Sequence, residues 1–232
     1  MEYTEEQIID MAGNDIVDYA GWVKDDFVCA NNFYLSDTVQ RTGKTTDTEL
    51  DYSEVVAEFL YKNKFIQKDN FTEIKQITRK KPYYTNKEFS SETSKLVKIF
   101  ERNSLQNNFG EIIDISVPLN NFETDMAGKI DILSYKKETN ELFIIQIKPH
   151  SSNETILRAI LEIQTLYQTM DKENLINDFY FIGKINSQNP KIKKVLVLED
   201  GSTTNQEYNC YMGNISNLIE DLQIEVLQIE WN

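Results

Sequence analysis

Residues 128–148 read Gly-Lys-Ile-Asp-Ile-Leu-Ser-Tyr-Lys-Lys-Glu-Thr-Asn-Glu-Leu-Phe-Ile-Ile-Gln-Ile-Lys, and this stretch decides the fold. Two apolar runs, 130–133 and 142–147, flank a polar segment of the kind that forms a hairpin turn, so two neighbouring strands are predicted. Each run also carries polar groups. Asp131 lies within the first run, whereas Gln146 and Lys148 lie at the end of the second.

These polar groups predict a site at the end of the strands. Gln146 and Lys148 are two positions apart, so on a strand they point to the same face. If the two strands pair antiparallel, Asp131 can lie beside them. Burying a carboxylate, an amide and an ammonium is costly unless they have partners. A hard divalent cation is the partner that oxygen ligands of this kind favour.

The segments on either side of this stretch complete an α/β pattern. Residues 153–171 carry apolar side chains at steps of three and four and form the strongest predicted helix. A helix over 91–103, starting after a Ser-Ser N-cap, precedes the first strand. Further strands are predicted over 112–119, 179–185, 194–198 and 224–231, with a helix over 216–222. Residues 88–232 are therefore expected to form a mixed central sheet flanked by helices.

Residues 1–87 differ from this core in composition. Helices are predicted over 4–24, with an interruption near Gly13, and over 52–62, whereas 27–50 read as a loop and 64–88 are ambiguous. Residues 1–52 contain twelve Asp or Glu and three Lys or Arg. We expect a mostly helical, acidic N-terminal region that packs on the core.

The bulk composition excludes several classes of protein. With 232 residues, 40% apolar and 27% charged, the chain is an ordinary globular protein. It shows no apolar stretch long enough to span a bilayer and no signal peptide. Cys29 and Cys210 lack metal-type spacing and are expected to be reduced thiols in a cytoplasmic protein. His150 is the only histidine, which excludes a His-rich zinc site.

The charge distribution bears on nucleic-acid binding. A net charge of −14 argues against a polyanionic partner. Residues 75–102 nevertheless hold eight Lys or Arg against three Glu. This basic strip fits either a nucleic-acid contact or a solvated helix face.

The order of elements, with Asp131 in the second strand of the core and Gln-Ile-Lys ending the third, resembles the PD-(D/E)XK nuclease superfamily. The resemblance covers roughly residues 88–200 and implies a restriction-endonuclease-like core. Ile130 stands where the family name has Pro. Gln146 stands where Asp or Glu is usual, which removes one negative charge from the expected metal site.

The resemblance implies roles for the matching residues. Asp131 would be the main ligand of a Mg²⁺ or Mn²⁺ ion, Gln146 would bind it through its amide oxygen, and Ile147 through its backbone carbonyl. Lys148 would orient or activate the attacking water. Glu92, near the start of the helix before the first strand, would complete the metal shell, with Glu101 as the alternative for that role.

Four other residues are candidate substrate contacts. Arg158 could meet a phosphate, His150 could face the scissile phosphate, and Gln164 could contact DNA; for these three a solvated or structural role is the alternative. Lys129 is a further possible substrate contact. The sequence thus predicts a metal-dependent nuclease that hydrolyses DNA, and the resemblance allows a homodimer. The alternative is a catalytically inactive module of the same fold that binds nucleic acid or protein.

Overall fold

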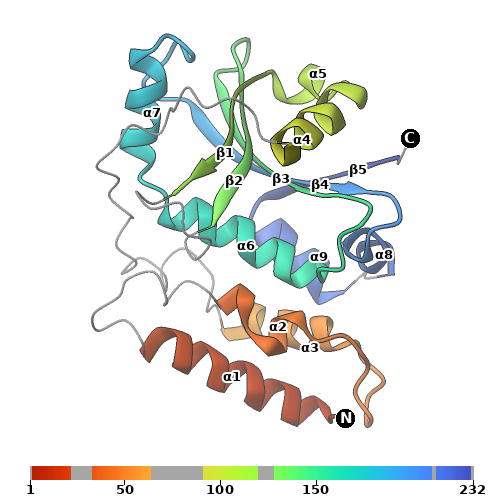
Figure 1. The fold of residues 1–232 in the computed structure, drawn as a ribbon. Coiled ribbons are helices and arrows are strands. Elements are labelled where there is room, and N and C mark those ends of the chain that lie inside the picture. The colour runs from red at the N-terminus through yellow and green to blue at the C-terminus, as the bar shows by residue number, and fades with distance from the viewer. Residues whose placement is uncertain (1, 22–32, 64–90, 120–127, 211–212, 231–232) are drawn as a thin grey trace.

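A five-stranded mixed sheet forms the centre of the structure, a computed structural model that describes residues 2–21, 33–63, 91–119, 128–210 and 213–230 (Figure 1). The strands lie in sequence order and are β1 (Glu111–Pro118), β2 (Lys129–Lys136), β3 (Glu141–Lys148), β4 (Lys191–Glu199) and β5 (Ile224–Ile229). β1, β2 and β3 pair antiparallel, whereas β4 runs parallel to β3 and β5 parallel to β4. The predicted α/β class with a mixed sheet and flanking helices is confirmed.

The hairpin of β2 and β3 opens at one end. Its ladder starts with Lys136 opposite Glu141 and ends with Ile132 opposite Ile145. β2 begins three residues earlier, at Lys129, and there it still pairs with β1. The two strands therefore separate over residues 129–131, and backbone groups at this end must find partners outside the ladder.

Helices cover both faces of the sheet (Figure 1). α4 (Ser91–Arg102) and α5 (Gln106–Phe109) cover one face, where Ile99, Phe100 and Phe109 pack with strand residues such as Phe143. α6 (Ile156–Thr169) and α9 (Asn214–Asp221) cover the other face. Alternate residues of β3 face the two layers, which explains why its run of apolar residues is continuous.

The N-terminal helices form a further layer on the α6 side (Figure 1). This layer comprises α1 (Glu5–Gly21), the short helices η2 (Phe33–Leu35) and α2 (Asp37–Gln40), and α3 (Tyr52–Asn63). α1 continues through Gly13 without interruption. The buried residues of α1 belong to the same hydrophobic cluster as those of α6 and α9. Glu54 of α3 also accepts hydrogen bonds from the backbone N–H groups of Asn214 and Ile215 at the start of α9.

Further elements differ from the prediction. Residues 179–185 were expected to form a strand, but 172–181 form helix α7 (Lys172–Phe181). The Asp171 side chain accepts a hydrogen bond from the Asn174 backbone N–H, which caps the helix, and Leu175 and Phe179 bury one helical face. Residues 203–210 form an unpredicted helix, α8 (Thr203–Cys210). Residues 64–88, whose sequence pattern is ambiguous, lie outside the described residues.

Candidate functional site

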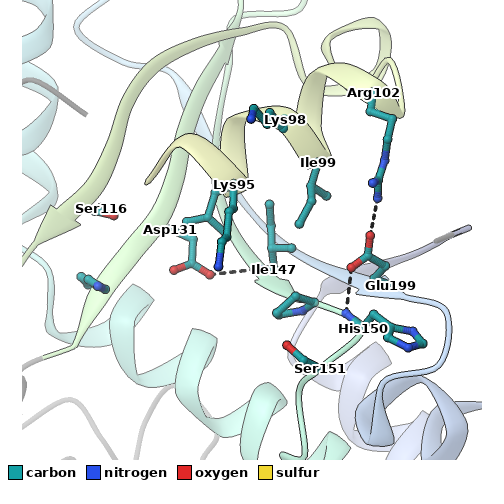
Figure 2. Close-up of a pocket in the computed structure, with 13 residues that line it drawn as sticks. Lys95, Lys98, Ile99, Arg102, Ser116, Asp131, Ile147, His150, Ser151 and Glu199 are labelled. Atoms are coloured by element: carbon teal, nitrogen blue, oxygen red, sulfur yellow. Dashed lines mark hydrogen bonds and ion pairs between the residues drawn. The ribbon is translucent and has the colours of Figure 1, made fainter. Parts of the chain in front are cut away.

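An open groove lies on the α4 side of the sheet, where β2 and β3 separate (Figure 2). Its volume is about 610 Å³. Most of its charged lining is basic. The residues that line it come from α4, from β1 to β4 and from the segment after β3: Lys95, Leu96, Lys98, Ile99, Arg102, Ser116, Lys129, Asp131, Ile147, Pro149, His150, Ser151 and Glu199.

Asp131 lies at the wall of this groove, with its carboxylate in the gap between the strands (Figure 2). Its Oδ2 accepts a hydrogen bond of 2.9 Å from the Ile147 backbone N–H, at a position of β3 that lies beyond the end of its ladder with β2. Burial raises the pKa of Asp131 to about 7, although this hydrogen bond and the charge of Lys148 act in the opposite direction. The groove thus contains a carboxylate that is costly to ionise.

Gln146 and Lys148 share one face of β3, as predicted, but that face is turned toward α6. Neither residue lines the groove. The Gln146 side-chain amide donates a 2.9 Å hydrogen bond to the Lys129 carbonyl, so it satisfies a second backbone group at the strand opening. The structure therefore differs from the expected single pocket, because neighbouring positions along a strand point to opposite faces.

Lys148 is buried and bound to two carboxylates. Its Nζ lies 2.6 Å from Glu162 Oε2 on α6 and also pairs with Glu154, just before α6. Burial alone would lower the pKa of Lys148, but the charges and hydrogen bonds of Glu162 and Glu154 outweigh it and raise the pKa above its ordinary value. Lys148 is therefore a fixed cation close enough to Asp131 to lower the pKa of that carboxyl.

The far end of the groove is closed by a structural network. Glu199 is buried and forms an ion pair with Arg102 of α4. The His150 backbone N–H donates to Glu199 at 2.8 Å, and the imidazole Nδ1 donates to the Asp200 carbonyl at 2.6 Å. The His150 ring packs against Gly201, where a Cβ atom would lie 2.1 Å from it, and it points away from Asp131 (Figure 2).

The other candidate substrate contacts are divided between the two faces. Lys129 is exposed and lines the groove. Arg158 lies on the α6 side, where it pairs with Glu154 at 3.1 Å and donates to Gln40 at 2.5 Å. Gln164 lies farther along α6 and accepts a hydrogen bond from Lys194.

The acidic residues predicted on α4 are less well placed. Glu92 belongs to the first turn of α4, but its side chain lies outside the described residues. Glu101 is exposed and does not line the groove. Within the described ranges, no three His, Cys, Asp or Glu side chains are grouped so as to hold a metal ion.

Glu154, Glu162 and Ser116 are among the residues of this region that were not singled out from the sequence. Glu154 and Glu162 hold Lys148, and their signal is a row of charges at steps of four, Glu154, Arg158 and Glu162, that runs from just before α6 into its second half. Ser116 lines the groove with a φ of 49°, a left-handed conformation that is rare inside a strand. No residue pattern indicates such a conformation at a serine.

Comparison with protein-family models, with curated proteins and with solved structures found no match for this chain. Among the helices of the described part of the chain, none is long and apolar enough to cross a membrane.

Proposed function

We propose that this protein is a metal-dependent nuclease that hydrolyses DNA phosphodiester bonds at the groove beside Asp131. The observation that carries the proposal is a carboxylate with a pKa of about 7 in a groove whose rim holds three lysines, Lys95, Lys98 and Lys129. A polyanion can bind to such a rim, and the carboxylate then lies next to a phosphate. The net charge of −14 does not oppose the binding of a polyanion, because the three lysines lie together at the groove.

The order of elements supports the proposal. A helix, three antiparallel strands, a helix and a strand parallel to the third follow one another, apart from the added α5 and α7. A restriction-endonuclease-like core, as the resemblance to the PD-(D/E)XK superfamily implies, has this order, with Asp131 and Lys148 on its second and third strands.

The residues present fit a weakly held hard cation. Asp131 is a carboxylate whose ionisation is opposed by burial, and a nearby divalent ion would offset that cost. Mg²⁺ or Mn²⁺ retains several waters and needs few protein ligands. Asp131 and the Ile147 carbonyl would hold it at the groove, with Glu92 as the further ligand that the resemblance implies. The Gln146 amide, which is turned toward α6 and bound to the Lys129 carbonyl, would have to leave that contact to join them. When bound, the ion would polarise a phosphoryl oxygen and lower the pKa of its water.

The protein's own side chains would position the substrate and supply charge. Lys95 and Lys98 line the groove from α4, and the Lys95 side chain reaches toward Asp131 (Figure 2). Lys129 lines it from β2. The three lysines would bind consecutive phosphates. Lys148 does not reach the groove, but its fixed charge beneath Asp131 favours the ionised carboxylate and any developing negative charge nearby.

A cleavage assay tests the proposal. We expect the wild-type protein to cleave plasmid or single-stranded DNA with Mg²⁺ or Mn²⁺, and Asp131→Asn to lower the rate by roughly 100-fold or more, because the main ligand of the ion is removed. Glu138→Gln, an exposed change in the β2–β3 turn, is the matched control and should leave the rate unchanged. Cleavage that persists in Asp131→Asn would overturn the assignment of the site.

A second candidate function is a non-catalytic module that binds nucleic acid. The observation that favours it is the engagement of Gln146 and Lys148 in structural contacts, which leaves both away from the groove. Under this alternative, the protein binds DNA in EDTA and cleaves none with either metal ion.

Binding through the groove has its own expected result. Replacing Lys95 or Lys98 by glutamine should weaken DNA binding in EDTA and reduce the slope of log affinity against log salt by about 0.9 for each phosphate that the variant no longer neutralises. Lys137→Gln, at the opposite end of the β2–β3 hairpin, should leave the slope unchanged. Equal slopes for all variants, measured by fluorescence anisotropy, would exclude the groove as the binding surface.

A further inference from the structure

A second cavity lies at the opposite end of β4 from the groove. Its volume is about 660 Å³, and it is enclosed by the C-terminal half of α6, the start of β4 and the turn between α9 and β5. This cavity lies on the α6 side of the sheet, whereas Asp131 lines the groove on the α4 side, so the sheet separates the two. Cavities of this size accommodate small molecules.

Lys194 is the buried cation of this cavity. Only 7% of its surface is exposed, and its Nζ donates to Gln164 Oε1 at 2.6 Å and to the Leu222 carbonyl at the end of α9. The Nζ also lies 4.8 Å from the centre of the Tyr167 ring. These partners are neutral. Among the described residues, no carboxylate lies within ion-pair distance of Lys194, although buried charges normally have a counter-charge.

The charged residues around the cavity are of both signs, but none forms an ion pair with Lys194 within the part of the chain that the structure describes. Lys172 lies 4.2 Å from the same Tyr167 ring and adds a second positive charge. Of the other charged residues that line the cavity, Lys193 is paired with Glu141 at 2.6 Å, and Lys191 adds a further positive charge. The lining also contains two carboxylates, Asp221 and Glu225, neither of which forms an ion pair with Lys194. Burial and the charge of Lys172 lower the pKa of Lys194 to about 8.

We propose that this cavity binds a small oxyanion, a molecule with a phosphate or carboxylate group, and that Lys194 is its buried counter-charge. The amide of Gln164 orients the ammonium, and Lys191 at the cavity wall adds attraction. The site is separate from the proposed nuclease site, so either can fail without the other.

Calorimetric titration of the full chain with pyrophosphate and with citrate tests this site in a buffer without other oxyanions. We expect saturable binding of one molecule per chain, and the two probes distinguish a phosphate from a carboxylate ligand. Lys194→Met should weaken binding by roughly tenfold or more, because a charge-assisted hydrogen bond to the anion is removed. Lys62→Met, an exposed lysine on α3, is the control and should bind as the wild type does.

Gln164→Glu is the more decisive variant, because it changes the charge and keeps the shape. The new carboxylate would lie beside the Lys194 ammonium and replace the anion, so binding should be abolished while thermal stability without ligand rises. Sulfate is the probe for the pH dependence. The affinity of the wild type for sulfate should fall as the pH rises from 7 to 9, since Lys194 loses its proton in that range. No saturable binding of any probe, or equal binding by Gln164→Glu and the wild type, would overturn the proposal.

Discussion

Asp131→Asn should stabilise the metal-free protein at pH 8 and leave its stability near pH 4 almost unchanged. The pKa of Asp131 is about 7 in the folded protein, against 3.8 for the ordinary side chain. Below pH 3.8 the carboxyl is protonated in both the folded and the unfolded protein, and its full contribution to the free energy of unfolding is present. As the pH rises from 3.8 toward 7, the unfolded chain releases the proton first, so this contribution is lost. Three pKa units correspond to roughly 4 kcal/mol at pH 8.

Urea unfolding between pH 4 and 8 in EDTA measures this effect. The wild type should lose free energy of unfolding across the range, and Asp131→Asn should lose much less of it. Asp47→Asn, an exposed aspartate of the N-terminal region, is the control and should follow the wild type. Parallel pH curves for the wild type and Asp131→Asn would show that burial of this carboxylate is not costly.

The same variants connect this titration with the proposed metal. Saturating Mn²⁺ at pH 8 should stabilise the wild type, since an ion beside Asp131 removes the cost of its negative charge and binds only the folded state. It should not stabilise Asp131→Asn. An equal shift in both proteins would place any bound Mn²⁺ elsewhere.

Lys148→Met should destabilise the protein by about 3 to 5 kcal/mol at pH 7, because a buried cation is removed and two partly buried carboxylates lose their counter-charge. The side chain of Lys148 is 8% exposed and that of Glu162 is 17% exposed. The double variant Lys148→Met/Glu162→Gln removes both charges of this pair, and we expect it to recover part of the loss. A double-mutant cycle from urea unfolding measures the coupling.

The chain offers a matched control for this cycle. Lys193 and Glu141 form a pair with the same 2.6 Å separation, but the lysine side chain is 33% exposed. Lys193→Met should therefore cost less than about 1 kcal/mol, as exposed ion pairs do. Similar costs for Lys148→Met and Lys193→Met would contradict the view that burial makes the Lys148 pair strong.

Local patterns in the sequence were sufficient where one physical effect dominates. The apolar runs 130–133 and 142–147 predicted β2 and β3, and the helical spacing of 153–171 predicted α6. The strand predicted over 179–185 was wrong, because the composition of Phe-Tyr-Phe-Ile favours a strand. A helix forms there instead of a strand because the Asp171 side chain caps its first turn and Phe179 is buried, while Phe181 remains 90% exposed.

The sequence by itself therefore determined the class of fold, the pairing of the central strands and the presence of Asp131, Gln146 and Lys148 at one end of the sheet. Only the tertiary structure decided which face each side chain occupies and which partner it meets. The ladder between β2 and β3 ends at the pair Ile132–Ile145, and the strands separate beyond it. The side chains of Asp131 and Gln146 therefore hydrogen-bond to backbone groups beyond the end of this ladder. Lys148 meets Glu162 because α6 packs across that face, a contact between positions fourteen residues apart that no local pattern specifies.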